Sequence, residues 1–468
     1  MNNWSKYNTL FQSQRFGYFL YNAMSNTFFQ LNETYYKFLE LLNKNTEHQS
    51  AEISEEFLTL LHEKNILTEE KNDKKKLMVK QYLRNCSCYN TPDFSITICP
   101  TLACNFHCFY CFEKTQKNTT VMSQETIDKL IVFIKKRISS KKIKIDWYGG
   151  EPTLAFDKIQ TITQRINNEG IVIDSARLVT NGYLLDSSMI NELNDLHIQS
   201  VQITLDGIQE IHDKRRRLRG GKATFERIIT NIDTLADSSY RGKCHIRVNI
   251  DKENMKSYTL LRKKLLERYK DKQVNIYASR VKGDAVSTLT SDEWTEFCLE
   301  LYRQDGIISN SIFYPKSNDF GSCVANFNAM YVIGPNGEIY KCWEDVGITK
   351  NVIGNIYHEE PISNYELLAA YNIGSDPYVD EKCLDCRFLP ICSEVCVKKR
   401  IESKFATDQK CHDYCTHFKN HLIPCLEEYY DIFLTAETSR NLLNLEIEPL
   451  SKKGYRIIQT EKTIAHPT

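Results

Sequence analysis

The chain has 468 residues, of which 41% are hydrophobic and 26% charged, as in ordinary soluble proteins. Because a domain typically holds about 100–200 residues, this length predicts two to four folding units. Lys plus Arg and Asp plus Glu number 60 each, so no global basic field points to nucleic acid. No window reaches the ~20 apolar residues of a membrane helix, and the polar start lacks a signal-peptide core. We therefore expect a cytoplasmic protein with no membrane partner.

The 17 cysteines exceed what a cytosolic protein usually carries. A reducing compartment keeps thiols from serving as structural disulfides, so metal or cluster ligation is the leading explanation. A secreted disulfide scaffold is the alternative, and both the length and the N-terminus argue against it.

Residues 1–75 indicate a small separate module. The aromatic alternation in "FGYFLYNAMSNTFFQLN" predicts a hairpin, and "ETYYKFLELLNK" and "EEFLTLLHEKNIL" predict helices after it. The module has the size of a winged helix. The charged segment "TEEKNDKKK" leads into a solvated linker, which we expect over residues 76–93.

Residues 94–310 alternate short β-rich runs with amphipathic helical patterns. The runs are "FSITICP", "KIKIDWYGG", "ARLVTNG", "VQITLDG", "HIRVNID" and "VNIYASRV". Six βα units with parallel strands are the natural interpretation, and the fold class is α/β. In barrels of this type, chemistry gathers at the C-terminal ends of the strands.

Residues 311–425 form a cysteine-rich region with few long apolar runs, and nine of the 17 cysteines fall within it. Such a region is expected to be held together by ligands more than by a large core. The tail at 426–468 is expected to be mainly helical.

The first run ends in "CNFHCFYC", which places Cys104, Cys108 and Cys111 within eight residues. Three thiolates on a cubane [4Fe–4S] cluster leave one iron open to a non-protein ligand. A tetrahedral zinc site completed by water is the competing chemistry. The compact spacing favours a cluster, because one loop can reach three corners of a cubane.

This motif resembles the CxxxCxxC signature of the radical S-adenosylmethionine (radical SAM) enzymes. The resemblance implies a partial (β/α)6 barrel in which the open iron chelates S-adenosylmethionine and the cofactor is cleaved to a 5′-deoxyadenosyl radical. It places the backbone of Tyr110 beside the adenine. It also implies that "GGEP" binds the amino group of the methionine moiety, through Gly149, Gly150, Glu151 and Pro152.

Further along the barrel, "TNG" and "TLDG" match family positions near the cofactor, with Thr180, Asn181, Thr204 and Asp206 as the residues concerned. Arg216 is our candidate for the cofactor carboxylate, although Arg215, Arg217 and Arg219 lie in the same run. Asn249 at the end of "RVNID" belongs to the same family pattern. We expect His107 and His212 to be structural.

The C-terminal cysteines resemble the seven-cysteine SPASM extension of radical SAM enzymes. The resemblance implies two auxiliary [4Fe–4S] clusters. One is held by Cys383, Cys386, Cys392 and Cys411, and the other by Cys323, Cys342 and Cys396. Where some relatives carry a further ligand, Ser317 stands six positions before Cys323. Cys415 or another thiol completes the second set, or one iron stays open. A zinc ribbon is the alternative, and the remaining cysteines are expected to be small buried hydrophobes.

These features predict a radical SAM/SPASM maturase of ribosomally made peptides that installs a crosslink. The N-terminal module resembles a peptide-recognition module, which can add a leader peptide to a sheet edge; an accessory packing role is the alternative. An anaerobic sulfatase-maturating, formylglycine-generating enzyme is the second hypothesis. A non-catalytic iron–sulfur electron-transfer or binding protein is the third. The enzyme hypotheses call for an electron donor such as flavodoxin or ferredoxin.

Overall fold

The computed structural model describes residues 3–44, 53–90, 94–111, 119–282, 287–309, 312–318, 323–393, 395–405, 414–441 and 453–458. The chain divides into two compact units. The first comprises residues 1–88, 291–323 and 376–468, and the second comprises residues 89–290 and 324–375.

The second unit is built on six parallel strands that lie side by side in sequence order. This confirms the predicted βα units and the α/β fold class. The strands are β6 (Phe94–Ile98), β7 (Lys142–Trp147), β8 (Val172–Thr180), β9 (Ile198–Leu205), β10 (Lys243–Ile250) and β11 (Val274–Arg280).

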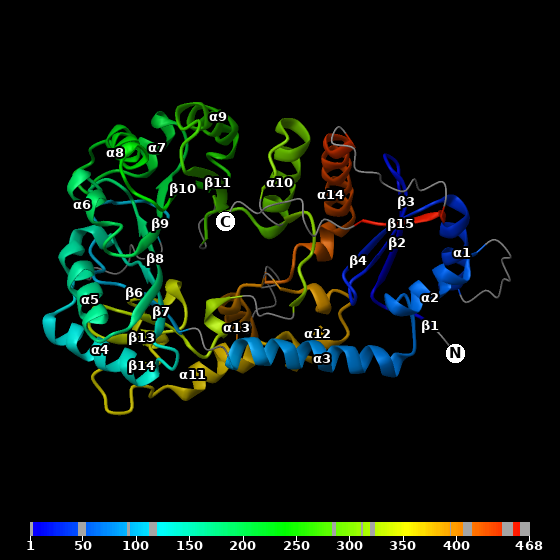
Figure 1. Cartoon of the computed structure of the whole chain (residues 1–468), viewed down its shortest axis with the longest axis horizontal. Helices are drawn as coiled ribbons and strands as arrows, with labels where there is room; N and C mark the ends of the chain where they lie inside the picture. Colours follow the sequence, from blue (N-terminus) through cyan, green and yellow to red (C-terminus); the bar gives the residue numbers. More distant parts are fainter. Residues whose placement is uncertain are drawn as a thin grey trace. The chain divides into compact units, whose positions relative to one another are not determined.

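Helices cover the outer side of this curved sheet (Figure 1). They are α4 (Gln124–Arg137), α5 (Phe156–Asn168), α6 (Ser187–Glu192), α7 (Gln209–Arg215), α8 (Phe225–Asp237) and α9 (Tyr258–Arg268). The Ser123 hydroxyl begins α4 by accepting from the Thr126 N–H at 3.1 Å. In β10 buried residues alternate with half-buried His245, Arg247 and Asn249, so the two faces of the sheet differ in polarity.

The same sheet continues past β6 into the predicted cysteine-rich region. Strand β12 (Met330–Ile333) runs parallel to β6, and β13 (Glu338–Tyr340) and β14 (Gly354–Asn355) follow antiparallel. The short helix α11 (Tyr365–Ala369) comes next. Residues 324–375 therefore share one unit with the barrel strands.

The N-terminal part of the first unit holds an antiparallel sheet in the order β15-β4-β3-β2. Its strands are β2 (Asn8–Ser13), β3 (Gly17–Asn22), β4 (Thr27–Leu31) and β15 (Tyr455–Ile457), and β1 (Asn3–Trp4) pairs separately with β5 (Leu67–Thr68). Helices α1 (Glu33–Asn43) and α2 (Glu55–Glu63) pack on the sheet through a core that includes Leu20, Phe29, Tyr35, Phe57 and Tyr455. The predicted order of hairpin and then helices is present.

The segment that we expected to be a solvated linker is helical, because α3 spans Glu70–Tyr89. Its many Lys, Leu, Met, Gln and Arg residues are strong helix formers, which explains the difference. The unit also contains α10 (Ser291–Asp305), α12 (Glu381–Leu384), α13 (Val397–Phe405) and α14 (Phe418–Asn441). The predicted tail therefore contains the C-terminal part of α14. After it comes the strand β15, which we did not predict.

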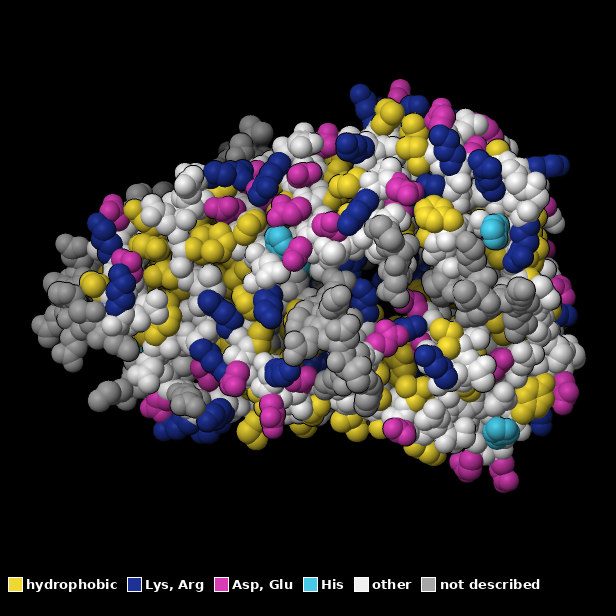
Figure 2. Space-filling view, turned by 180° about the vertical axis from the view of Figure 1, so that it is seen from behind, with side chains coloured by type: hydrophobic (Ala, Val, Ile, Leu, Met, Phe, Trp, Pro, Cys, Tyr) yellow, Lys and Arg dark blue, Asp and Glu magenta, His cyan; other side chains and the backbone are white. Residues whose placement is uncertain are grey.

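On the face drawn in Figure 2, basic and acidic side chains are interspersed, with hydrophobic ones scattered between them. This distribution agrees with the equal numbers of acidic and basic residues. None of the helices in the described part of the chain combines the length and the apolar character needed to span a bilayer.

Candidate active site

The three-cysteine loop follows β6 directly and lies at the C-terminal end of that strand. Cys104, Cys108 and Cys111 are all half-buried thiols. The Cys104 sulfur accepts from the Phe106 N–H at 3.4 Å, and the Cys111 N–H donates to the Cys108 carbonyl at 3.3 Å. Burial raises the pKa of Cys104 to about 12, and the charges of Glu151 and Cys108 add to the effect. Without a metal the thiols of Cys104 and Cys108 would stay protonated, whereas iron ligation deprotonates them.

The glycines of "GGEP" let the end of β7 approach this loop closely. A Cβ on Gly150 would lie 2.3 Å from the Ala103 carbonyl oxygen, and Gly149 has a φ of +117°. The backbone is joined to the loop by bonds from the Gly150 N–H to Thr101 (3.2 Å) and from the Glu151 N–H to Ala103 (2.8 Å). Only glycine fits such contacts, so this turn fixes the cysteine loop.

Glu151 is a buried carboxylate that ties the ends of β7 and β8 together, with 1% of its surface exposed. One oxygen accepts from the hydroxyls of Thr153 and Thr180, both at 2.6 Å, and from the Thr153 N–H at 3.1 Å. The other accepts from the Asn181 N–H at 2.7 Å. Since a carboxylate oxygen can take about two donors, the second oxygen keeps room for one more.

The Tyr110 hydroxyl lies where the cysteine loop meets the ends of β9 and β10. It donates to Asp206 at 2.8 Å and accepts from Arg216 at 2.7 Å and from Asn249 at 3.2 Å. Four of the predicted cofactor residues are therefore brought together by one hydroxyl group. Burial raises the pKa of Tyr110 well above its usual value, so the hydroxyl stays protonated.

The structure separates the roles of Arg215 and Arg216. Arg215 is committed to three carboxylates, with Asp206 at 3.0 Å, Asp251 at 2.7 Å and Glu253 at 3.0 Å. The Nε of Arg216 is buried and has no partner among the described residues. Arg216 is therefore the arginine of this run with a buried donor to spare, as our prediction requires.

The two histidines near the site differ in exposure. His212 is fully buried, accepts from the Asp206 N–H at 3.3 Å and bonds the Thr224 hydroxyl at 3.1 Å. Burial lowers its pKa well below the usual value, so the ring is neutral and holds the turn after β9. His107 is exposed on the cysteine loop.

The other predicted residues occupy more structural positions. Pro152 is the first residue of a 3₁₀ turn that spans Pro152–Ala155. Thr204 lies inside β9, where it pairs in register with Arg247. Thr180 ends β8, and the Asn181 side chain donates to the Asn105 side chain at 2.7 Å.

Asn105 is a site residue that our sequence reasoning missed, although it lies within "CNFHCFYC". Its Nδ2 is buried without a partner in the described structure. An unpaired buried donor is costly unless a ligand satisfies it. Together with the Arg216 Nε and the glycine turn, it makes the site fit a bound polar cofactor such as S-adenosylmethionine beside a cluster.

The C-terminal cysteines of the first unit also gather. The Cys386 N–H donates to the Cys383 carbonyl at 2.9 Å. Burial raises the pKa of Cys392 to about 12, and the charges of Cys383 and Cys415 raise it further. Burial and the charges of Cys383 and Cys386 likewise raise the pKa of Cys415. These four thiols therefore lie close enough to interact.

The remaining predicted ligands have separate positions. Cys411 lies outside the described residues. Cys323 belongs to the first unit and Cys342 to the second. Cys396 precedes α13 in the first unit, and all three of these thiols are half-buried.

Exposure separates most of the candidate ligands from the other cysteines. Every described candidate ligand is half-buried, whereas Cys88, Cys99, Cys244, Cys298 and Cys425 are buried. Cys86 is the exception, because it is half-buried and not the small buried hydrophobe that we expect. Within the described ranges, no three His, Cys, Asp or Glu side chains converge on a point that could hold a metal ion. A cubane does not need such convergence, because each thiolate binds a different iron.

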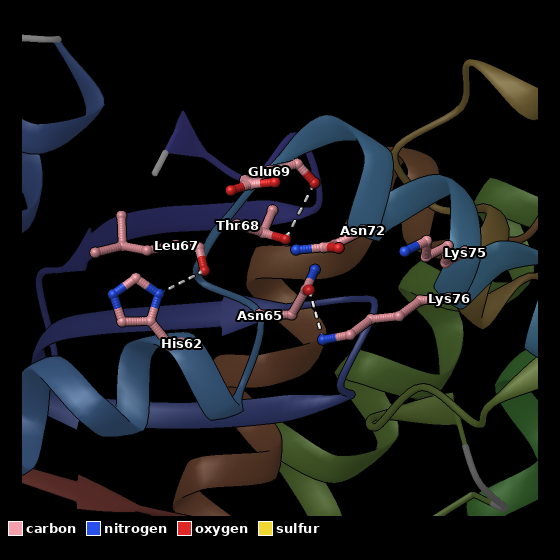
Figure 3. A pocket seen from close by; sticks show the side chains of 8 residues that line it. All are labelled: His62, Asn65, Leu67, Thr68, Glu69, Asn72, Lys75 and Lys76. Atoms are coloured by element: carbon pink, nitrogen blue, oxygen red, sulfur yellow. Dashed lines mark hydrogen bonds between the residues drawn. The ribbon is translucent and has the colours of Figure 1, made fainter. Parts of the chain in front are cut away.

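A further cavity of about 310 Å³ lies between α2 and α3 (Figure 3). Lys76 donates to Asn65 at 2.6 Å, and a His62 ring nitrogen lies 3.2 Å from the Leu67 carbonyl oxygen. These polar groups of the cavity lining are therefore hydrogen-bonded within the N-terminal module, and we assign no ligand to this cavity.

Comparisons with known proteins agree with this geometry. Residues 98–264 match the model of the Radical SAM superfamily. The serine-type anaerobic sulfatase-maturating enzyme of Bacteroides thetaiotaomicron is 24% identical over 73% of this chain and 92% of its own length. The cysteine-type enzyme of Clostridium novyi is 24% identical over 68% of this chain and 91% of its own. The solved structure titled "Native anSMEcpe with bound AdoMet and Cp18Cys peptide" has a TM-score of 0.55 at 20% identity, covering 73% of this chain and all of that one.

The parallel sheet, the three-cysteine loop and the family match thus define a radical SAM domain in the second unit. The chain therefore contains the radical SAM domain that the three-cysteine loop predicted, over residues 98–264.

Proposed function

We propose that the enzyme abstracts hydrogen from a ribosomally made peptide and installs a crosslink, such as a thioether or a carbon–carbon bond. S-adenosylmethionine and its cluster, when bound, supply a 5′-deoxyadenosyl radical after one-electron reduction. The observation that carries the proposal is the convergence of Asp206, Arg216 and Asn249 on the Tyr110 hydroxyl beside the cysteine loop.

The chain's own residues would bind and orient the cofactor. Cys104, Cys108 and Cys111 would hold the cluster. The free acceptor of Glu151 suits the ammonium group of the methionine moiety, and the spare donor of Arg216 suits its carboxylate. In the first unit, Cys383, Cys386 and Cys392 would hold one auxiliary cluster, with Cys411 of the family pattern or the nearby Cys415 as the fourth ligand. Cys323, Cys342 and Cys396 would contribute to the other.

The substrate proposal rests on the N-terminal sheet. Strand β15 covers the β4 edge, and β2 is the opposite edge of the sheet. A leader peptide would then add to β2 by main-chain hydrogen bonds. Binding of a peptide that the enzyme modifies should slow the hydrogen exchange of the β2 amides. Slowing confined to β4 with release of β15 would contradict this placement.

A second candidate is an enzyme that oxidises a Cys or Ser of a protein to formylglycine. The two sulfatase-maturating relatives favour it, since each matches about nine-tenths of its own length. Ser317, at the position of a further ligand in some relatives, accepts from the Lys80 ammonium at 2.9 Å. A serine whose hydroxyl already accepts a hydrogen bond is a poor iron ligand. The further cluster ligand of those relatives is therefore missing at this position, which counts against the second candidate.

The test uses a panel of synthetic peptides that contain Cys and Ser, incubated anaerobically with reduced enzyme and S-adenosylmethionine. A product that has lost two hydrogens and does not react with a hydrazide supports a crosslink. A hydrazide-reactive product supports formylglycine. Formation of 5′-deoxyadenosine without any modified peptide would contradict the peptide class, and absence of both would leave the non-catalytic alternative.

A further inference from the structure

Arg400 is a buried cation in the cysteine-rich part of the first unit, with 2% of its side chain exposed. It lies in α13, and its N–H donates to the Cys396 carbonyl at 3.0 Å. Because burying a guanidinium is unfavourable unless its charge and donors are matched, the groups around it show what it serves.

The Arg400 guanidinium contacts both a carboxylate and a thiol. Its Nη2 donates to Asp380 at 2.9 Å and to the Cys383 sulfur at 3.2 Å. Its Nε is buried and has no partner among the described residues. One carboxylate balances the charge, yet the donors of the guanidinium are not all used.

Arg400 also lies near the segment that carries Cys415. The guanidinium lies 5.5 Å from the centre of the Tyr414 ring, and Cys415 is the next residue. The charge of Arg400 counteracts the increase in the pKa of Cys392 that burial causes. Asp380 is itself fixed, because it accepts from the Lys382 N–H at 3.1 Å at the start of α12.

We propose that Arg400 is a positioning residue for an iron–sulfur cluster held by Cys383, Cys386, Cys392 and a fourth thiol, and that it raises the reduction potential of this cluster. The inference rests on the proposed auxiliary cluster. Four thiolates make such a cluster anionic, and reduction adds a further negative charge. A nearby cation and N–H···S hydrogen bonds therefore stabilise the reduced state more than the oxidised one.

The experiment uses the full chain with Cys104→Ala, Cys108→Ala and Cys111→Ala, so that only auxiliary clusters form on reconstitution with iron and sulfide. Each protein is titrated with dithionite and redox mediators, and the reduced clusters are followed by electron paramagnetic resonance. In this background we compare Arg400→Gln, Arg400→Lys and Asp380→Asn. The control is Arg15→Gln, which removes another arginine of the same unit, paired with Glu428 at 2.9 Å.

Arg400→Gln should lower one midpoint so that the ratio of reduced to oxidised cluster falls about tenfold at fixed potential, or ~59 mV for one electron. Arg400→Lys should shift it less, and Asp380→Asn should raise it. Arg15→Gln and the second cluster should be unaffected.

An unchanged midpoint in Arg400→Gln at full iron content would overturn the inference. If that variant does not load iron, Arg400→Lys and Asp380→Asn decide, and shifts of both in the same direction would overturn it equally. A background protein that binds no iron would instead refute the auxiliary clusters, and with them the proposed function.

Discussion

Tyr110 is the residue on which the proposed cofactor site depends most, through its hydroxyl group. Tyr110→Phe leaves Asp206 and Arg216 without a shared partner in a buried place. Hydrogen bonds to charged groups contribute about 1.5–3 kcal/mol, so we expect the KM for S-adenosylmethionine to rise about tenfold or more. The measurement is the rate of 5′-deoxyadenosine formation against cofactor concentration.

Tyr240→Phe is the matched control, because Tyr240 is a tyrosine of the same unit whose hydroxyl is buried without a partner in the described structure. Its KM should stay that of the wild type. Equal effects of the two substitutions would contradict a specific role for Tyr110.

His212 predicts a pH dependence of stability in the second unit. Its folded-state pKa lies well below the value of 6.5 expected for the unfolded chain. The unfolded state then binds more protons, so His212 favours folding fully above pH 6.5. This contribution is lost as the pH falls from about 6.5 towards the lowered pKa, by up to ~1.4 kcal/mol per pH unit.

The measurement is the opening free energy of β9 and β10 amides by hydrogen exchange, corrected for intrinsic rates. His212→Gln should flatten the dependence below pH 6.5. His197→Asn, at an exposed position with a φ of +57°, should keep it. The same slope in all three proteins would show that another group is responsible.

At the scale of elements, the turn after β7 supports the cysteine loop. Gly150→Ala would place a methyl group against the Ala103 and Leu102 carbonyl oxygens, at 2.3 and 2.4 Å. Since backbone cannot move aside as a flexible side chain can, the loop must shift. We expect loss of about four irons and of cofactor cleavage. Gly220→Ala, where nothing lies within 4 Å, should retain both; a fully loaded Gly150→Ala enzyme would refute this view of the turn.

The strand β15 makes a second prediction at this scale. Tyr455 packs on Phe57 with ring centres 4.7 Å apart, and the Ile458 N–H donates to Phe28 at 2.9 Å. Tyr455→Ala should weaken protection of β4 amides in hydrogen exchange by about 3 kcal/mol, as large aromatic truncations do. Lys453→Ala removes an exposed pair with Glu56 at 3.6 Å and should cost less than about 1 kcal/mol. Unchanged β4 protection in Tyr455→Ala would mean that β15 does not support the sheet.

For the whole molecule, the sequence predicted those features that depend on neighbouring residues in the chain. The six barrel strands follow from apolar runs that end in polar turns, and the cysteine loop follows from its spacing. Pattern could not choose between Arg215 and Arg216, because only the fold shows which one is surrounded by carboxylates. Nor could it pair Tyr455 with Leu31, since three residues carry no periodic signal and the contact crosses nearly the whole chain.

The helix α3 differs from the sequence prediction for another reason: the charge of this segment indicates a linker, whereas the helix propensity of its residues favours a helix. The ligand pattern at the C-terminus has the same limit. The family pattern implies Cys411, which lies outside the described residues, and the spacing alone does not show that Cys415 lies near Cys383, Cys386 and Cys392.

The most direct test of the central claim compares the wild type with the Cys104→Ala/Cys108→Ala/Cys111→Ala variant after anaerobic reconstitution with iron and sulfide. Iron is quantified, and dithionite-dependent formation of 5′-deoxyadenosine from S-adenosylmethionine is assayed. We predict about twelve irons per wild-type chain, a loss of about four in the variant, and no cofactor cleavage by the variant. Zinc in place of iron, or full iron content without cofactor cleavage by the wild type, would contradict the account.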